Sequence, residues 1–484
     1  MSKTKAKAKP KAKPKAKAKQ QKLEWGLEPS LDAFESLMWR LDQYPNLRST
    51  VVGLEILDCA PHRQRLRNAH RWAVQTVPRL RQRLIDSPSR LPEWVDDPDF
   101  DLDKHLDFVK LQDEGSMRQL LDAAQEYAML PFDDGRPLWS ALVFEGLEGG
   151  RAAYLLKLHH SLSDGIGIIQ LLSFMHSRQR QPSGRTAAAE AEAGKKAKIP
   201  GKLAVFGRQL RRELDKAPDR IREISHGIRA GLRKPDDQSY VSKMARYMAS
   251  LRRVMDPPKI QSSPLLKPRN NLWHFDCMDI PLAAFKAAAK SCGATMNDAF
   301  VSAIIGAFRR YHLCFDVDLD EIPIVIPISI RSEKDSAGGN HFAAGYLSGP
   351  IGEADPVKRM QDIGGQVSRL RQEPAMKATM AIMPVLARLP APMVAKIMGP
   401  KMAANDIQMS NVPGIAEDVY MAGAKITHVY PLPPLPGCPA MVAMVSHGEH
   451  CCLGINLDRA AVTEPEVMMR CLRESFDEIL ALGH

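Results

Sequence analysis

The chain has 484 residues, of which 44% are hydrophobic and 25% are charged, and its formal net charge at pH 7 is +11. This composition is typical of a globular protein, and the length is enough for two domains of roughly 200 residues each. The positive charge is concentrated at one end, because residues 1–22 contain ten lysines and no acidic residue. We expect a disordered tail there, and specific nucleic-acid binding is disfavoured because the tail contains no aromatic residue and no recognition motif appears.

The sequence has no apolar run of about 18 residues and no apolar stretch directly after its basic start, which argues against a transmembrane helix and a signal peptide. We therefore expect a cytoplasmic protein. The eight cysteines are scattered without a CxxC pair. They predict reduced, buried thiols, with no disulfide framework and no metal site.

In chain order, the first half alternates helical and extended patterns. The patterns predict a helix over residues 30–43, a strand over 48–58, a second helix over 60–84, and a strand over 152–160 that leads into another helix. The composition then becomes polar and alanine-rich, which is typical of a linker. We expect a tail at 1–22, an N-terminal domain at 23–180, a linker region at 181–260 and a C-terminal domain at 261–484.

The linker region contains a basic segment, residues 202–234, with ten Lys or Arg and four acidic residues. Apolar residues recur there at mostly helical spacing, which predicts a basic amphipathic helix. Such a helix either packs on its own protein or contacts a membrane or lipid surface, and the sequence leaves both possibilities open.

The C-terminal half repeats the mixture of α and β patterns. Strands are predicted over residues 271–280, 321–330 and 441–458, and helices over 281–292, 296–312 and 465–482. Residues 380–405 are rich in Met and Leu and are interrupted by prolines. This segment either lines a pocket for a flexible apolar chain or forms two core helices joined by a kink.

The segment HHSLSDG, residues 159–165, gathers titratable groups between two apolar runs. Strand alternation predicts that His160 shares a face with Leu156 and Leu158, whereas His159 lies on the opposite face with Lys157. A histidine at the end of a strand can remove a proton from a hydroxyl near neutral pH. No GxSxG motif supplies a serine nucleophile, so direct transfer is favoured over a covalent intermediate.

The two residues after this turn have structural interpretations. Asp164 either caps the following helix or pairs with an arginine that fixes the loop. Gly165 allows a tight turn and a close approach of the backbone.

HHSLSDG resembles the HHxxxDG motif of the acyltransferases related to chloramphenicol acetyltransferase and to peptide-synthetase condensation domains. Further motifs narrow the resemblance: PLW at 137–139, ND at 297–298, PISIR at 327–331, GGNHF at 338–342 and SNVPG at 410–414. Together they resemble the bacterial wax ester synthase/diacylglycerol acyltransferase family from about Leu31 onward. The DFGWG motif of other relatives is absent, which fits this branch.

The resemblance implies two α/β domains of chloramphenicol-acetyltransferase type, with a substrate tunnel at their interface that leads to His160. It implies transfer of a long acyl chain from acyl-CoA, a substrate and not a cofactor, to diacylglycerol or a long-chain alcohol. His160 is then the general base, and Asn297 donates to the oxyanion, caps its helix, or does both.

The other residues of these motifs are expected to support the site. Arg331 is the expected partner of Asp164, while Pro137, Leu138 and Trp139 line the tunnel or shape the fold. The remaining supporting residues are His159, Gly165 and Asp298.

Two other functions compete with this hypothesis. One is an acyltransferase that takes its acyl group from a carrier protein, and the other is a catalytically silent protein that coats lipid inclusions. For the enzyme we expect peripheral association with the inner face of the membrane or with lipid inclusions, without a specific nucleic-acid partner.

Overall fold

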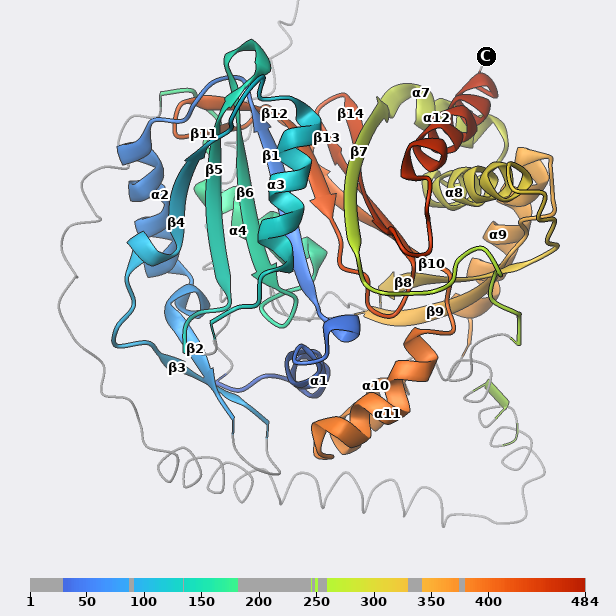
Figure 1. Ribbon diagram of the computed structural model, residues 1–484, viewed down its shortest axis with the longest axis horizontal. Helices are drawn as coiled ribbons and strands as arrows, with labels where there is room; N and C mark the ends of the chain where they lie inside the picture. The colour runs from blue at the N-terminus through green and yellow to red at the C-terminus, as the bar shows by residue number, and fades with distance from the viewer. Residues whose placement is uncertain are drawn as a thin grey trace, which may run out of the picture.

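The computed structural model describes residues 29–86, 91–133, 135–181, 245, 249–250, 259–329, 342–373 and 379–483. The lysine-rich tail, the basic segment 202–234 and Arg331 lie outside the described residues. The described chain forms two six-stranded sheets that lie side by side, with helices packed on their faces (Figure 1). The fold is therefore mixed α and β with two sheet-rich units, as the sequence predicted.

The first sheet has the strand order β11-β12-β1-β6-β5-β4. Its strands are β1 (Thr50–Leu57), β4 (Leu106–Lys110), β5 (Trp139–Leu147), β6 (Arg151–His159), β11 (Tyr420–Met421) and β12 (Ala424–Leu432). Helices α2 (Arg63–Thr76) and α4 (Gly165–Met175) pack on one face, and α3 (Met117–Met129) packs on the other. The smaller elements are α1 (Ala33–Leu41), η1 (Pro45–Leu47), η2 (Pro78–Arg81), η3 (Leu102–Lys104), η4 (Glu148–Gly150) and the two-stranded ladder of β2 (Gln82–Ile85) with β3 (Glu93–Asp96).

The second sheet has the strand order β7-β14-β13-β10-β8-β9. Its strands are β7 (Trp273–Pro281), β8 (Ile322–Ser329), β9 (Phe342–Gly349), β10 (Ile407–Ile415), β13 (Ala440–His447) and β14 (His450–Asp458). Four helices bury a common apolar core against it: α7 (Leu282–Ser291), α8 (Met296–Leu313), α9 (Pro356–Arg371) and α12 (Pro465–Ala481). Two further helices, α10 (Thr379–Leu386) and α11 (Ala391–Met402), project below the sheets and pack on α1 (Figure 1).

Strand β12 lies in the first sheet although it comes from the C-terminal half of the chain. It pairs antiparallel with β1, with Val52 opposite Leu432 and Ile56 opposite His428. It also packs on β14, where Gly454 lies against the carbonyl of Pro431 with no room for a Cβ atom. The boundary expected at residue 261 therefore does not separate the two sheets.

Side-chain alternation along β6 agrees with the sequence pattern. Tyr154, Leu156 and Leu158 belong to the core shared with α2 and α4, whereas Leu155 belongs to the core shared with α3 and with Phe275 of β7. One face of β6 is thus internal to the first unit, and the other faces the second unit.

Helix starts follow local capping chemistry. Asp32 and Glu35 form a capping box at α1, and Ser116 and Gln119 form one at α3. In each box the cap side chain accepts the backbone N–H of the third helical residue, whose side chain accepts the N–H of the cap.

Two predicted elements needed correction. The helix expected over 60–84 ends at Thr76, because Pro78 disfavours helical geometry at the residue before it and cannot donate a helical hydrogen bond. The strand expected over 441–458 is a hairpin of β13 and β14, with Gly448 at a positive φ of 54° in its turn.

Candidate active site

The two histidines of HHSLSDG lie where β6 ends. His159 is the last residue of the strand, opposite Thr50 of β1, and His160 begins the turn toward α4. The backbone N–H of His160 donates to the carbonyl of Ser49 at 2.9 Å. His159 is only 1% exposed, whereas His160 is half-buried, so His160 is the more accessible of the two.

The ring of His159 has a polar neighbour at each nitrogen, a hydrogen bond at Nδ1 and the carboxylate of Asp42 near Nε2. The backbone N–H of Ser161 donates to Nδ1 at 3.1 Å, so Nδ1 is an acceptor and the ring proton is on Nε2. Nε2 lies 3.3 Å from Oδ1 of Asp42, the residue that ends α1. The ring of His159 thus joins the turn to the end of α1.

Asp42 connects this ring with the segment that holds His160. Its Oδ1 also accepts the backbone N–H of Ser49 at 3.1 Å, and Ser49 in turn accepts from His160. Burial acts to raise the pKa of Asp42, but the hydrogen bonds and charges of its neighbours, His159 first, lower it below the ordinary value of 3.8. A fixed carboxylate therefore sets both the His159 ring and the backbone ahead of His160.

Lys157 is a second buried charge beside this turn. Its ammonium donates to the carbonyls of Tyr127 and Leu130 and lies 4.6 Å from the ring centroid of Phe132. Burial lowers the pKa of Lys157 from 10.5 to about 8. The face of β6 that carries His159 is thus polar at its end, although the rest of that face is apolar.

Asp164 and Gly165 have the structural roles expected at the start of α4. Asp164 is the N-cap, and its Oδ1 accepts the backbone N–H of Gly167 at 2.9 Å. Its expected partner, Arg331, lies outside the described residues. A Cβ atom on Gly165 would lie 2.8 Å from Cγ2 of Val412, so the glycine allows the two segments to meet.

Val412 belongs to the SNVPG motif, which forms the end of β10. The register of β10 against β13 is irregular between Val412 and Ile415, which is the mark of a bulge. Gly414 lies against the carbonyl of Ser446 with no room for a Cβ atom. The HHxxxDG and SNVPG motifs, about 250 residues apart in the sequence, therefore meet where α4 of the first unit packs on β10 of the second.

The ND motif lies at the first turn of α8. The cap of this helix is Thr295, whose capping-box partner is Asp298, so the expectation that Asn297 caps the helix was wrong. Asn297 is half-buried at the second helical position, and Asp298 lies beside Gly364 of α9. These contacts give Asp298 a role in helix capping and helix packing.

The PLW motif is part of the first core. Leu138 is 5% exposed and Trp139 is 2% exposed. The indole N–H of Trp139 donates to the carbonyl of Leu80 at 2.7 Å, and its ring stacks on His105 and His70. For Leu138 and Trp139 these contacts favour a role in shaping the fold.

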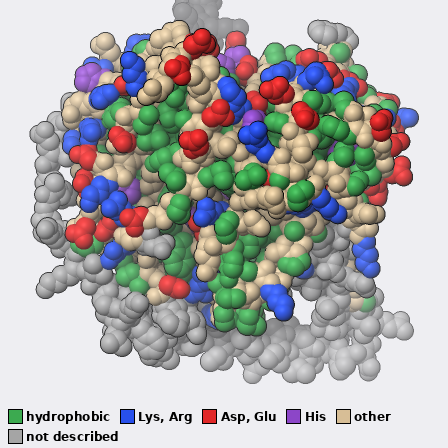
Figure 2. All heavy atoms as spheres, in the orientation of Figure 1, with side chains coloured by type: hydrophobic (Ala, Val, Ile, Leu, Met, Phe, Trp, Pro, Cys, Tyr) green, Lys and Arg blue, Asp and Glu red, His purple; other side chains and the backbone are tan. Residues whose placement is uncertain are grey.

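The structure agrees only in part with the two predictions made for residues 380–405. α10 and α11 are two helices as predicted, but only one side of the pair is buried. Their inner side packs on α1 through a cluster that includes Leu37, Leu41 and Val394. Their outer side exposes Val385 (62%) and Met393 (51%), and Figure 2 shows hydrophobic side chains gathered at this lower edge. In the part of the chain that the structure describes, no helix combines the length and the apolar character needed to cross a bilayer.

A cavity of about 390 Å³ lies between α11 and the segment that follows α1. Its lining includes Tyr44, Asn46 and Leu47 on one side and Gly399 on the other. His160 is not among the lining residues. The cavity is thus a separate space beside the segment that leads to Ser49.

Sequence reasoning missed three residues of this site: Asp42, Lys157 as a buried cation, and Val412 as the contact of Gly165. A lysine within the apolar run YLLKLHH was the visible sign of a buried charge. Asp42 gave no local signal, because its contact with His159 depends on how α1 packs.

Comparisons with known proteins agree with these motifs. Residues 31–300 match the family model of the wax ester synthase/diacylglycerol acyltransferase catalytic domain, and residues 338–480 match the model of the C-terminal domain of the same family. A Mycobacterium tuberculosis H37Rv protein named as a diacylglycerol O-acyltransferase is 36% identical over 465 residues, which cover 94% of this chain and 93% of the relative. O-acyltransferase WSD of Acinetobacter baylyi is 27% identical over 407 residues, which cover 80% of this chain and 84% of the relative.

Solved structures share the fold. The wax ester synthase/diacylglycerol acyltransferase from Marinobacter aquaeolei VT8 aligns with a TM-score of 0.62 at 19% identity, over 94% of this chain and all of that one. The first condensation domain of the calcium-dependent antibiotic synthetase aligns with a TM-score of 0.59 at 14% identity, over 95% of this chain and 97% of that one. With both family domains matched over most of its length, the chain belongs to the wax ester synthase/diacylglycerol acyltransferase family.

Proposed function

We propose that this chain is an acyl-CoA-dependent O-acyltransferase of triacylglycerol and wax ester synthesis in which His160 is the general base. The donor is a long-chain acyl-CoA, and the acceptor is diacylglycerol or a long-chain alcohol. The family and the names of the relatives support the reaction class. The same names argue against a catalytically silent coat protein.

One observation carries the choice of His160. His159 is buried and both of its ring nitrogens have partners, Ser161 and Asp42, whereas His160 is half-buried at the junction of the two units. A general base must come within hydrogen-bonding distance of the proton that it removes. The partly accessible ring of His160 meets this condition better than the buried ring of His159.

The proposed reaction is a direct transfer. His160 accepts the proton of the acceptor hydroxyl while that oxygen attacks the carbonyl carbon of the thioester, and the carbonyl oxygen becomes an oxyanion. Collapse of the tetrahedral intermediate breaks the C–S bond, and the protonated His160 returns its proton to the coenzyme A sulfur. Acyl-CoA is consumed as a substrate, and the proposed step invokes no cofactor and no metal ion.

The surrounding residues position this base. Asp42 and Ser49 fix the turn from the side of α1, and the contact of Gly165 with Val412 fixes it from the side of β10. For the oxyanion we propose Asn297 as donor, since a side-chain amide can direct an N–H at developing charge. Asn297 lies in the first turn of α8. Asn297→Ala tests this role and should lower kcat on the order of 10²-fold.

We further propose that the outer side of α10 and α11 rests on an anionic lipid surface. Val385, Met393 and Ile397 are exposed there, and residues 379–405 carry three cations and no acidic residue. Apolar side chains beside cations are the combination that binds a membrane interface. This contact would hold the enzyme peripherally at the inner face of the membrane or on lipid inclusions, in the cytoplasm.

The test of the reaction is coenzyme A release from palmitoyl-CoA, with hexadecanol and dipalmitoylglycerol as separate acceptors. We expect acceptor-dependent release that falls by about 10²- to 10⁴-fold in His160→Ala. His62→Asn is the matched control, because it removes an imidazole from the cap of α2 and supplies another good N-cap residue. No release with either acceptor, or the same release from His160→Ala, would contradict the proposal.

The test of the lipid surface is cosedimentation with vesicles that contain an anionic phospholipid. Replacement of Val385, Met393 and Ile397 by serine should lower the bound fraction several-fold. The control replaces Leu313 and Phe315, which are 44% and 38% exposed at the end of α8, by serine. Equal losses in the two variants would refute a specific role for α10 and α11.

A further inference from the structure

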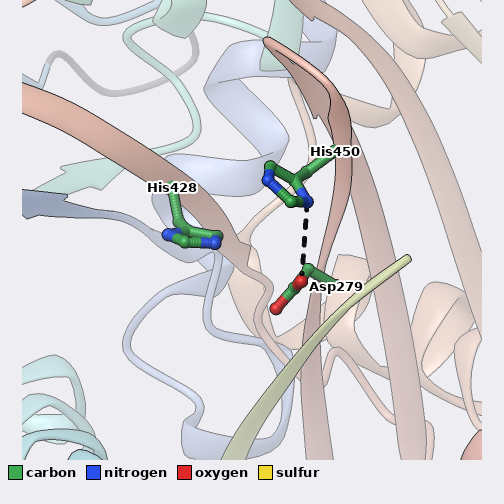
Figure 3. Close-up of side chains that lie close together, drawn as sticks. All are labelled: Asp279, His428 and His450. Atoms are coloured by element: carbon green, nitrogen blue, oxygen red, sulfur yellow. Dashed lines mark ion pairs between the residues drawn. The ribbon is translucent and has the colours of Figure 1, made fainter. Parts of the chain in front are cut away.

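Three potential metal ligands meet at the boundary of the two sheets, far from the HHSLSDG turn. They are Asp279 of β7, His428 of β12 and His450 of β14, and one ligand atom of each lies within 4.8 Å of the others. Figure 3 shows the two imidazoles and the carboxylate turned toward a common space. β12 belongs to the first sheet and the other two strands to the second, so the cluster spans the boundary.

The cluster is separate from the proposed active site. His428 lies opposite Ile56 near the end of β1, whereas His159 lies opposite Thr50 at its start. Six residues of extended strand separate these positions by on the order of 20 Å. A ligand in the cluster would therefore not touch the groups that surround His160.

The hydrogen bonds around His428 favour metal ligation. The hydroxyl of Thr427 donates to the carbonyl of Ile56 at 3.1 Å, so its oxygen can only accept from Nδ1 of His428, which lies 3.1 Å away. Nδ1 therefore carries the ring proton, and Nε2 keeps its lone pair. A ligating histidine typically has its second nitrogen held in this way.

Asp279 and His450 complete the set. Oδ1 of Asp279 accepts from the hydroxyl of Tyr430 at 3.4 Å, while Oδ2 lies 3.6 Å from Nδ1 of His450. This nitrogen is buried and has no hydrogen-bond partner among the described residues. Nδ1 of His450 and Oδ2 of Asp279 thus face each other at ion-pair distance, too far apart for a hydrogen bond, and a metal ion between them would bind both atoms when the nitrogen carries no proton.

We propose that Asp279, His428 and His450 bind a divalent transition-metal ion, zinc above all, that joins the two sheets. Two imidazoles and one carboxylate suit zinc, whereas calcium and magnesium prefer sets made of oxygen alone. Zinc bonds of about 2.0 to 2.2 Å require the three ligands to close by roughly 1 Å, with water in the fourth position. The side chains of Asp279 and His450 are 40% and 41% exposed, so they have the freedom to move inward.

The sequence predicted no metal site, because its eight cysteines are scattered and form no CxxC pair. The three ligands are widely spaced, at positions 279, 428 and 450, and only the packing of β12 on β14 brings them together.

The test uses the full chain, freed of metal by a chelator, and zinc ions alone. Isothermal titration should give one zinc per chain, and His428→Gln and His450→Gln should each weaken binding by on the order of 100-fold or more. Thr427→Val leaves all three ligands in place and should weaken binding by roughly 10- to 100-fold, because it releases the His428 ring. His62→Asn and Cys314→Ser, which remove an exposed imidazole and an exposed thiol elsewhere, should bind as the unchanged protein does.

Two further readouts keep the result interpretable. Zinc should raise the midpoint of thermal unfolding of the unchanged protein but not of His428→Gln, because a ligand that binds only the folded state stabilises it. Asp279→Asn repeats the test if a histidine variant fails to fold. One-to-one binding that persists unchanged in both histidine variants, a cobalt derivative with thiolate charge-transfer bands, or no binding at all would overturn the proposal. None of these measurements needs acyl transfer, so they are independent of the proposed function.

Discussion

The contact between Gly165 and Val412 predicts a specific coupling between the two halves of the chain. Gly165→Ala adds a Cβ atom 2.8 Å from Cγ2 and 3.5 Å from Cγ1 of Val412. Carbon atoms in ordinary contact are about 3.5 to 4.0 Å apart, so α4 and β10 would have to separate by up to roughly 1 Å. Gly165 does not have a positive φ, so the backbone accepts alanine and only the clash counts.

The expected cost of Gly165→Ala is about 1 to 3 kcal/mol, the usual penalty for one excess methyl group in a packed site. Val412→Ala removes both methyl groups that the new Cβ would meet. In that background Gly165→Ala should cost close to nothing, which corresponds to a coupling energy of about 1 to 2 kcal/mol.

The measurement is denaturant unfolding of the two single variants and the double variant, followed by tryptophan fluorescence. Gly399→Ala in α11 is the control, because a Cβ atom there would meet nothing within 4 Å. Activity of the same variants should follow the stability pattern if the contact positions the His160 turn. Equal costs of Gly165→Ala in the two backgrounds would refute the reasoning.

The remaining predictions concern buried charges and their pH dependence. Burial lowers the pKa of His70 from 6.5 to about 4, so between these pH values the unfolded state binds a proton that the folded state does not. Between pH 7.5 and 4.5 the free energy of unfolding of the unchanged protein should therefore fall by about 2.5 kcal/mol relative to that of His70→Gln. Urea unfolding at both pH values measures this difference. Burial lowers the pKa of Lys157 to about 8, so the folded state releases the proton at a lower pH than the unfolded state does, and stability should rise with pH. Between pH 7.5 and 10 the free energy of unfolding should rise by about 2 kcal/mol relative to that of Lys157→Met. A difference between the two proteins that does not change with pH would contradict the assignment of Lys157 as a buried cation. Asp42→Asn should lower kcat by about 10- to 100-fold with little change in KM, because the turn that carries His160 loses the carboxylate that fixes it. The control is Asp86→Asn, which removes the exposed partner of Arg40 and should leave kcat and KM unchanged. Equal losses of kcat in the two variants would contradict a role of Asp42 in the site.

Local patterns in the sequence predicted the elements that local chemistry controls. The alternation along β6 and the cap at Asp164 were both readable, because each depends on residues within one or two turns of the chain. Two wrong predictions could have been avoided from equally local signals. Pro78 ends the helix that was expected to reach residue 84. The T-x-x-D pattern at Thr295 is a capping box, which places Asn297 inside its helix and not at the cap.

Contacts between distant segments could not be predicted in this way. The pairing of Asp42 with His159 requires the packing of α1, and the site around His428 requires β12 to cross into the first sheet. Neither leaves a periodic signal, because the partners are more than 100 residues apart.

The crossing of β12 has a consequence for biosynthesis. The backbone N–H of Lys425 donates to Asp58, a residue 367 positions earlier. A ribosome that adds about 5 to 20 residues per second needs roughly 20 to 75 seconds to make the intervening segment. During that interval β1 is an uncovered edge strand, which is a template for aggregation, so the nascent chain should depend on chaperones until the C-terminal half emerges.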